Sequence, residues 1–271
     1  MQQPDTEHYA LGYENEIVSK LNLRSVAREG AFILPYVKPE ARMLDAGCGP
    51  GSLTLGFAPH IAPGRISGID IDTDQITLAR EAAVNQGMDN VDFHHASVYE
   101  LPFEDDTFDI VFGHTLFMHL SQPEAALKEI HRVCKKGAIV GIRDGLGSID
   151  RLLTGPINPQ ISDLYQLLKK ITALSGGDPD VGIKLKGLLH HCGFNDIRIK
   201  PFSEVYDTAA DMEMLKQWHQ SLLQGSLGQL AVKHNLLSNS EREQLIEQMN
   251  EWPNNPEAIS VITWIEHIAR K

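Results

Sequence analysis

The residues best suited to bind a ligand form a glycine-rich loop near position 50 of the chain. An apolar run ends in Asp45, and Gly47, Gly49 and Gly51 follow at alternate positions before a helical pattern begins. Glycine reaches positive φ without strain and lacks the Cβ atom that would keep a ligand away from the backbone. The loop therefore predicts a site where a nucleotide-like ligand contacts main-chain N–H groups.

The spacing of the glycines separates several kinds of nucleotide site. A dinucleotide-binding loop reads G-x-G-x-x-G, but Ser52 stands where its third glycine would lie, which disfavours a nicotinamide oxidoreductase. A phosphate-binding P-loop is excluded, because no Gly-Lys-Ser/Thr follows. On its own, G-x-G-x-G also occurs in turns that bind nothing.

A second strand-like run, residues 66–70, ends in Asp70, 19 positions after Gly51. An acid at the tip of the second strand, about 20 residues after such a loop, accepts hydrogen bonds from ribose hydroxyls. We therefore expect Asp70 to bind a ribose and Ile71 to cover one face of the adenine. Asp72 with Gln75 three positions on indicates a capped helix start.

Several stretches in order resemble the class I S-adenosylmethionine (SAM) dependent methyltransferases. Residues 43–54 resemble motif I of that family, residues 101–113 the approach to strand four, and residues 131–138 the turn into strand five. Within the class, the chain is most similar to the small-molecule branch of the ubiquinone and menaquinone methyltransferases. The features that carry this likeness are Tyr9 with Tyr13, His114 with His119, and Arg143-Asp144.

The resemblance implies that SAM is the cofactor and that the reaction transfers a methyl group to a small, apolar or aromatic molecule, as in secondary metabolism. It also implies that a first helix carrying Tyr13 closes over the methionine end, although Tyr9 and Tyr13 could equally be ordinary half-buried aromatics. The expected cofactor-binding residues are Tyr13, Asp45, Gly47, Cys48, Gly49, Gly51, Asp70, Ile71, Gln75, Ser97, Val98 and His114.

One departure from the family affects the expected cofactor site. Where the family usually has an Asp that binds the adenine amino group, this chain has Ser97. Replacing a charge-assisted hydrogen bond by a neutral one weakens binding by roughly 1 kcal/mol, about five- to tenfold in affinity. The main-chain N–H of Val98 is placed to meet an adenine ring nitrogen. SAM binding is expected to be weaker, not abolished.

His114 and His119 are the candidates for catalysis, and each has two readings. A general base at His114 would contribute typically 10²–10⁴-fold, but the residue could instead only hydrogen-bond or pack beneath the cofactor. His119 could be a structural histidine. No third ligand stands at a useful spacing, and the three cysteines form no C-x-x-C, so no metal site is expected.

Composition limits the partners. The 271 residues carry a formal charge of −12, which argues against nucleic acid. No basic N-terminal region precedes an apolar run, and no apolar stretch reaches about 18 residues, which predicts a cytoplasmic protein without a membrane span. A homodimer is possible but not readable from the sequence.

Strand and helix patterns alternate over residues 42–143, which predicts an α/β fold: a doubly wound, mostly parallel, Rossmann-like sheet of seven strands. Later helical blocks are expected to cover the carboxyl ends of the strands as a lid. The expected divisions are N-terminal helices over 1–40, a SAM-binding core over 41–147, lid insertions over 148–178 and 207–255, a core helix and strand over 179–206, and a last strand over 256–271. The alternative function is a SAM-binding regulatory or non-methylating protein on the same scaffold.

Overall fold

The computed structural model describes residue 18 and residues 21–146, 151–154 and 159–271. Tyr9 and Tyr13 lie outside the described residues, as does most of the expected N-terminal helical block. Helices were expected over residues 1–40, of which residues 21–40 are described continuously. The structure instead has one short turn of helix, α2 (Val26–Glu29), and a 3-10 turn, η1 (Leu34–Tyr36). Gly30 ends the first and Pro35 starts the second, so no long helix forms.

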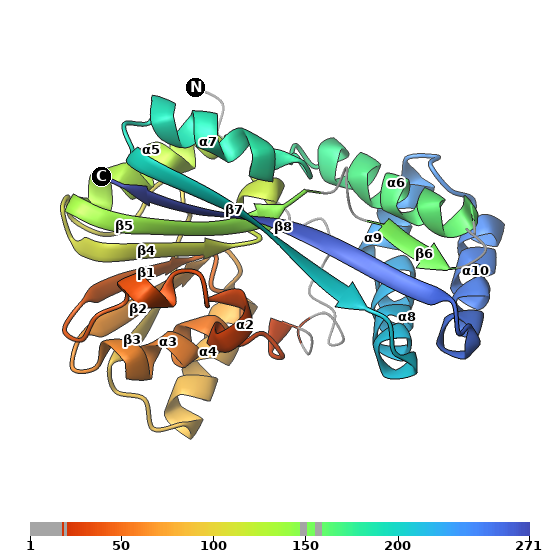
Figure 1. Ribbon diagram of the computed structural model, residues 1–271, viewed down its shortest axis with the longest axis horizontal. Helices are drawn as coiled ribbons and strands as arrows, with labels where there is room; N and C mark the ends of the chain where they lie inside the picture. The colour runs from red at the N-terminus through yellow and green to blue at the C-terminus, as the bar shows by residue number, and fades with distance from the viewer. Residues whose placement is uncertain (1–17, 19–20, 147–150, 155–158) are drawn as a thin grey trace.

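A mixed sheet organises the described residues (Figure 1). Five parallel strands lie in the order β3 (Val91–His95), β2 (Arg65–Asp70), β1 (Arg42–Ala46), β4 (Phe108–His114) and β5 (Cys134–Gly145). The antiparallel strand β8 (Ala258–Arg270) pairs with β5. Because all five parallel strands end at one edge, the loops after β1, β2 and β4 meet there.

Strand β8 is long enough to have several neighbours. Along one edge it pairs with β7 (Asn195–Tyr206), from Ser260 to Arg270. Along the other it pairs first with β5 and then, beyond it, with the short β6 (Arg151–Thr154). The sheet therefore contains eight strands among the described residues. Because β5 and β6 lie along the same edge of β8, one beyond the other, the sheet is seven strands across, as the sequence predicted. Strand β6 is a correction, because residues 148–175 were expected to be helical, with breaks only at Gly155-Pro156 and Pro159.

Helices cover both faces of the parallel strands, which confirms the doubly wound fold. On one face lie α3 (Ser52–Ile61) and α4 (Thr73–Asn85), and on the other α5 (Pro123–Val133) and α7 (Val181–His191) (Figure 1). Helix α5 packs against the sheet through one side, because its buried residues recur at helical spacing and the rest of the helix is polar. The buried set is Ala126, Leu127, Ile130 and Val133.

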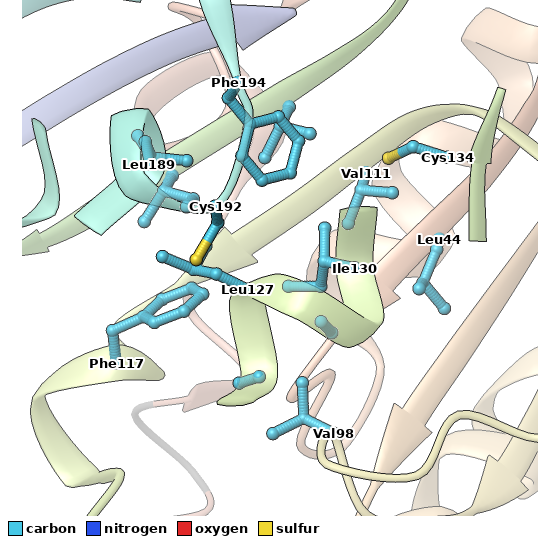
Figure 2. Packing of buried hydrophobic residues seen from close by; sticks show 14 of the residues in the cluster. Leu44, Val98, Val111, Phe117, Leu127, Ile130, Cys134, Leu189, Cys192 and Phe194 are labelled. Atoms are coloured by element: carbon cyan, nitrogen blue, oxygen red, sulfur yellow. The ribbon is translucent and has the colours of Figure 1, made fainter. Parts of the chain in front are cut away.

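The largest apolar cluster fills the layer beneath α5 and α7 (Figure 2). Phe117 and Phe194 are fully buried there, together with Leu127, Ile130 and Leu189. Burying a side chain of this size stabilises a fold by roughly 1.5–3 kcal/mol. This packing fixes the 3-10 turn η2 (Phe117–His119), and with it the loop that follows β4.

Strands β7 and β8 continue past the parallel strands toward a group of helices (Figure 1). The group contains α6 (Pro159–Leu174), α8 (Ala209–Gln224), α9 (Ser226–Lys233), α10 (Asn239–Gln248) and the 3-10 turn η3 (Met249–Asn254). These helices share their own apolar cluster around the fully buried Leu223 and Trp252. Capping boxes at Thr208 and Ser238 start α8 and α10. The two cores are thus joined by the β7–β8 ribbon.

Candidate active site

The glycine loop joins β1 to α3 at the carboxyl edge of the sheet. The N–H groups of Gly47 and Cys48 both donate to the carbonyl oxygen of Ile69, at 2.9 and 2.8 Å, which ties the loop to the end of β2. Gly51 has φ of +86°, and a Cβ built on it would lie 2.9 Å from the Cβ of Ala79. Gly51 therefore serves the packing of α3 against α4, and the loop before it faces outward.

Asp70 lies at the tip of β2, beside this loop. Its Oδ2 accepts a hydrogen bond from the N–H of Gly49 at 2.8 Å, and its Oδ1 accepts one from the N–H of Asp72 at 3.0 Å. Burial raises the pKa of this carboxyl, while the backbone N–H donors oppose the shift. Each carboxylate oxygen can accept two hydrogen bonds, so Asp70 keeps acceptor capacity toward the cleft it lines.

Asp45 is buried beneath the loop. The hydroxyl of Thr54 donates to its Oδ2 at 2.6 Å. Burial raises the pKa of Asp45 to about 7, and the Thr54 bond opposes that rise. The residue therefore carries a negative charge only near or above neutral pH, and a cation in the cleft would favour its ionised form.

The loops after β1, β2, β3 and β4 enclose a first cleft, which brings most of the predicted cofactor residues together. From the first two strands come Asp45, Gly47, Cys48, Gly49, Asp70 and Ile71. From the next two come Ser97, Val98, His114 and His119. Two predicted residues do not line it: Gly51 packs against α4, and Gln75 is buried in α4, where its N–H donates to Asp72. Tyr13 lies outside the described residues.

Ser97 occupies the position where an acid was expected. Its hydroxyl oxygen accepts a hydrogen bond from the N–H of Tyr99 at 3.2 Å. The hydroxyl proton remains available in the cleft, and Val98 lies beside it, buried. This end of the cleft is therefore neutral, unlike the end that holds Asp70.

A second cleft adjoins the first at the end of β4. The residues common to both are Leu21, Arg24, His114, Thr115 and His119. His114 is 6% exposed, and its Nδ1 lies 3.3 Å from the hydroxyl oxygen of Thr115. Within the part of the chain that the structure describes, its Nε2 has no hydrogen-bond partner. His114 therefore offers a buried polar atom at the junction of the two clefts.

The environment of both junction histidines opposes their protonation. Burial, with the charges of Arg24, Arg143 and Arg28, lowers the pKa of His114 well below its ordinary value. Burial and Arg24 lower the pKa of His119 to about 4. Both imidazoles are neutral at physiological pH.

The turn that carries these histidines is held from β5. Asp144 is fully buried, and its carboxylate accepts hydrogen bonds from the N–H of Phe117 at 2.7 Å and of Gly145 at 2.9 Å. Burial raises the pKa of Asp144 to about 7, against the lowering effect of these N–H donors. The N–H of Thr115 donates to the carbonyl oxygen of Arg143 at 2.9 Å. Asp144 is thus a positioning residue that the sequence marked only as a family likeness.

Helices α6 and α8 and strands β7 and β8 form the far wall of the second cleft. Apolar lining residues include Met118, Leu168, Met214, Leu222, Ile262 and Trp264. Charged residues also line it, and the sequence analysis missed their role: Arg24, Arg28, Glu29, Arg143, Lys169 and Glu204. Their sequence positions are scattered, so no spacing pattern could have grouped them.

The residues of the first cleft fit SAM. Asp70 presents a preoriented carboxylate of the kind that binds ribose hydroxyls, and Gly49 leaves space in front of the backbone, since a Cβ there would meet nothing closer than Leu21 at 3.8 Å. The sulfonium and ammonium groups of SAM are cations, which suits a cleft with Asp45 and Asp70 in its wall.

Comparisons with known proteins agree with this geometry. A family model described as a methyltransferase domain matches residues 44–142. An uncharacterized methyltransferase of Schizosaccharomyces pombe is 33% identical over 191 residues, which span 68% of this chain and 67% of that protein. The chain belongs to the class I SAM-dependent methyltransferases. The resemblance stated from the motifs is therefore confirmed.

Two further comparisons extend that result. A demethylmenaquinone methyltransferase of Bacillus cytotoxicus is 32% identical over 133 residues, which cover 46% of this chain and about half of that protein, 53%. The crystal structure of the YcgJ protein of Bacillus subtilis shares the fold, with a TM-score of 0.61 at 18% identity over 90% of this chain and 98% of that one. The chain therefore shares the Rossmann-like fold of that structure, and its family transfers methyl groups from SAM.

Metal binding and membrane insertion are two further properties on which the described residues give information. Among the described residues, no group of three or more His, Cys, Asp or Glu side chains is arranged to hold a metal ion. Over the same residues, no helix is long and apolar enough to cross a membrane.

Proposed function

We propose that the first cleft binds SAM with its ribose on Asp70 and its adenine between Ile71 and the Ser97–Val98 segment. The observation that carries this proposal is the carboxylate of Asp70, held by the N–H groups of Gly49 and Asp72 and aimed into the cleft. Cys48 and Gly47 provide main chain along the remainder of the ligand, near Asp45. Tyr13 is proposed to close over the methionine end from the N-terminal segment.

We further propose that the methyl acceptor is a small, apolar or aromatic metabolite bound in the second cleft. Most of that cleft's wall is apolar, and it opens onto the first cleft at His114. The methyl group of SAM is already electrophilic, so the protein's main task is to align acceptor, methyl and sulfur. Holding two reactants in line can contribute several kcal/mol to the rate.

The helices around the second cleft are proposed to act as a lid. Residues of α6 and α8 line the same cavity as His114, which supports this proposal. A closed lid would exclude water from the acceptor and strengthen the electrostatic contacts inside. His114 is placed either to take a proton from an acceptor that must lose one or to hold the acceptor by a hydrogen bond.

Titration calorimetry with SAM, followed by product analysis on a panel of metabolites, tests the proposal. We expect SAM to bind at micromolar concentration, Asp70→Ala to weaken it strongly, and a methylated product to form. No affinity below about 1 mM, together with no effect of Asp70→Ala, would overturn the cofactor assignment. Binding without turnover of any panel member would favour the alternative, a non-methylating SAM-binding protein.

A further inference from the structure

The two clefts differ in charge, although the chain as a whole is acidic. The first cleft contains the carboxyls of Asp45 and Asp70. The second contains four cationic side chains, Arg24, Arg28, Arg143 and Lys169, against two carboxylates. In a chain of formal charge −12, this concentration of cations in a mostly apolar cavity needs a reason.

Arg143 lies beside His114, at the end of the second cleft that adjoins the first. It is fully buried on β5, and it pairs in register with His114 on the neighbouring parallel strand. Paired residues of parallel strands point to the same side of the sheet, so both side chains face the second cleft, which both line. The ring of Trp264 lies 5.8 Å from the His114 ring and 5.5 Å from the guanidinium carbon of Arg143.

The carboxylates of the cavity are engaged in holding the arginines. Glu204 accepts hydrogen bonds from Trp264 Nε1 at 2.8 Å and from the Tyr206 hydroxyl at 3.1 Å, and its other oxygen lies 3.0 Å from Arg28 Nε. Glu29 accepts a hydrogen bond from Arg28 Nε at 2.8 Å. Both acids are therefore ion-paired with the arginines, although Glu204 Oε1 has no hydrogen-bond partner within the described residues.

The guanidinium of Arg143 is less fully satisfied. One of its Nη atoms donates to the carbonyl oxygen of Arg28 at 3.0 Å, and the other lies 3.5 Å from Glu204. Within the described residues its Nε has no hydrogen-bond partner, as is also true of His114 Nε2. A buried donor without a partner is costly, so the site is built for a ligand that supplies acceptors.

We propose that the second cleft binds its methyl acceptor as an oxyanion, a carboxylate, enolate or acidic phenolate on an apolar or aromatic body, with Arg143 and Arg24 facing the negative charge. The inference rests on the proposed function, because it identifies the substrate class of that same site. The apolar body lies against Trp264 and Met214, and the oxyanion lies at the junction beside His114.

An oxyanion makes the methyl transfer simple to balance. A lone pair on the acceptor oxygen forms the new O–CH₃ bond, and the electron pair of the broken S–CH₃ bond stays on sulfur. The negative charge of the acceptor and the positive charge of the sulfonium cancel. A weakly acidic hydroxyl gives its proton to solvent when it binds, so no proton moves during the transfer. His114 then acts as a positioning residue, a neutral imidazole whose Nε2 can donate to the oxyanion.

Three probes with the same aromatic body test the charge preference: 2-naphthoate, 2-naphthylmethanol and 2-naphthylmethylammonium. Calorimetry measures their dissociation constants on the full chain saturated with S-adenosylhomocysteine. Because a charge-assisted hydrogen bond contributes about 1.5–3 kcal/mol, we expect 2-naphthoate to bind at least about tenfold more tightly than the alcohol. The ammonium compound should bind weakest.

Variants assign that preference to the arginines. Arg24→Gln and Arg143→Gln should each reduce the naphthoate-to-alcohol ratio to within about threefold. Arg24 also lines the first cleft, so SAM affinity is a separate readout for Arg24→Gln, and it should improve because a cation beside a cationic ligand is removed. The control is Lys128→Gln, an exposed cation on α5 that pairs with Glu124, and it should change neither ratio nor affinity.

The outcomes separate the two proposals. If the wild type binds neither SAM nor S-adenosylhomocysteine, the proposed function fails. If it binds both but takes the alcohol or the ammonium compound as tightly as naphthoate, only the oxyanion inference is overturned. Should Arg143→Gln fail to fold, Arg24→Gln and the half-exposed Arg28→Gln still decide the question, with retained S-adenosylhomocysteine binding as evidence of folding.

Discussion

The substitution Asp70→Asn tests the ribose contact with the least change in shape. Asp70 uses one oxygen for the N–H of Gly49 and the other for the N–H of Asp72. An amide has a single acceptor oxygen, so one of these N–H groups loses its partner and faces the amide's own NH₂. The substitution also removes the negative charge that would strengthen hydrogen bonds from the ribose hydroxyls.

The expected loss follows from those bonds. A hydrogen bond to a charged group contributes about 1.5–3 kcal/mol, and a neutral one about 1 kcal/mol. Losing one charge-assisted bond and weakening a second removes roughly 2–5 kcal/mol of binding free energy, which raises the dissociation constant for SAM about 30-fold or more. The free energy of unfolding should fall less than the binding free energy. Burying the charged carboxylate disfavours its ionised form, as its raised pKa shows, and a neutral amide has no such desolvation cost.

Titration calorimetry with SAM, with thermal unfolding of the same samples, measures the two effects separately. Asp74→Asn is the matched control, since Asp74 is exposed in the first turn of α4 and does not line the cleft. A SAM affinity for Asp70→Asn within about threefold of wild type would refute the ribose assignment. An equal loss in Asp74→Asn would show that the effect is not specific to the site.

Three further predictions follow from single contacts. Gly51→Ala should lower the free energy of unfolding, measured in urea, by roughly 1–3 kcal/mol, because it adds a Cβ atom 2.9 Å from the Cβ of Ala79 at a residue with φ of +86°. An unchanged midpoint of urea unfolding would contradict this prediction. Burial raises the pKa of Asp45 to about 7. The free energy of unfolding of the wild type should therefore fall relative to that of Asp45→Asn as pH rises from 4 to 7, by up to about 1.4 kcal/mol per pH unit. Above pH 7 the difference between the two proteins should stay constant. A difference in unfolding free energy that stays constant between pH 4 and pH 7 would show that the pKa of Asp45 is not raised. His114→Gln, which keeps an N–H donor, should lower kcat/KM for an anionic acceptor less than tenfold, whereas loss of a general base would cost about 10²–10⁴-fold.

The first cleft was predictable because its determinants are local in sequence. Strand ends at Asp45 and Asp70 and the glycines between them each carry a pattern that depends on a few neighbouring residues. Parallel topology then brings those ends together at one edge, so sequence spacing predicted that these residues line one cleft. Gln75 shows the limit of this reasoning: its spacing indicated the start of α4, but its side chain points into protein and away from the cleft.

The second cleft was not predictable in the same way. Its walls come from residues as distant in sequence as Arg28, Arg143 and Glu204, which only the β5–β8–β7 pairing brings together. Trp264 lines the cleft and donates to Glu204, and no sequence motif marks it for that role. Residues 151–154 were predicted to be helical but form strand β6. The strand depends on long-range pairing with the far end of β8, which a short apolar run in the sequence does not reveal.

The most direct test of the central claim is a crystal structure of the chain with S-adenosylhomocysteine. The proposed function predicts that the ribose hydroxyls lie within hydrogen-bond distance of Asp70, the adenine lies beside Ile71 and Ser97, and the sulfur points toward His114 and the second cleft. A ligand bound elsewhere, or one whose sulfur faces away from His114, would contradict the account.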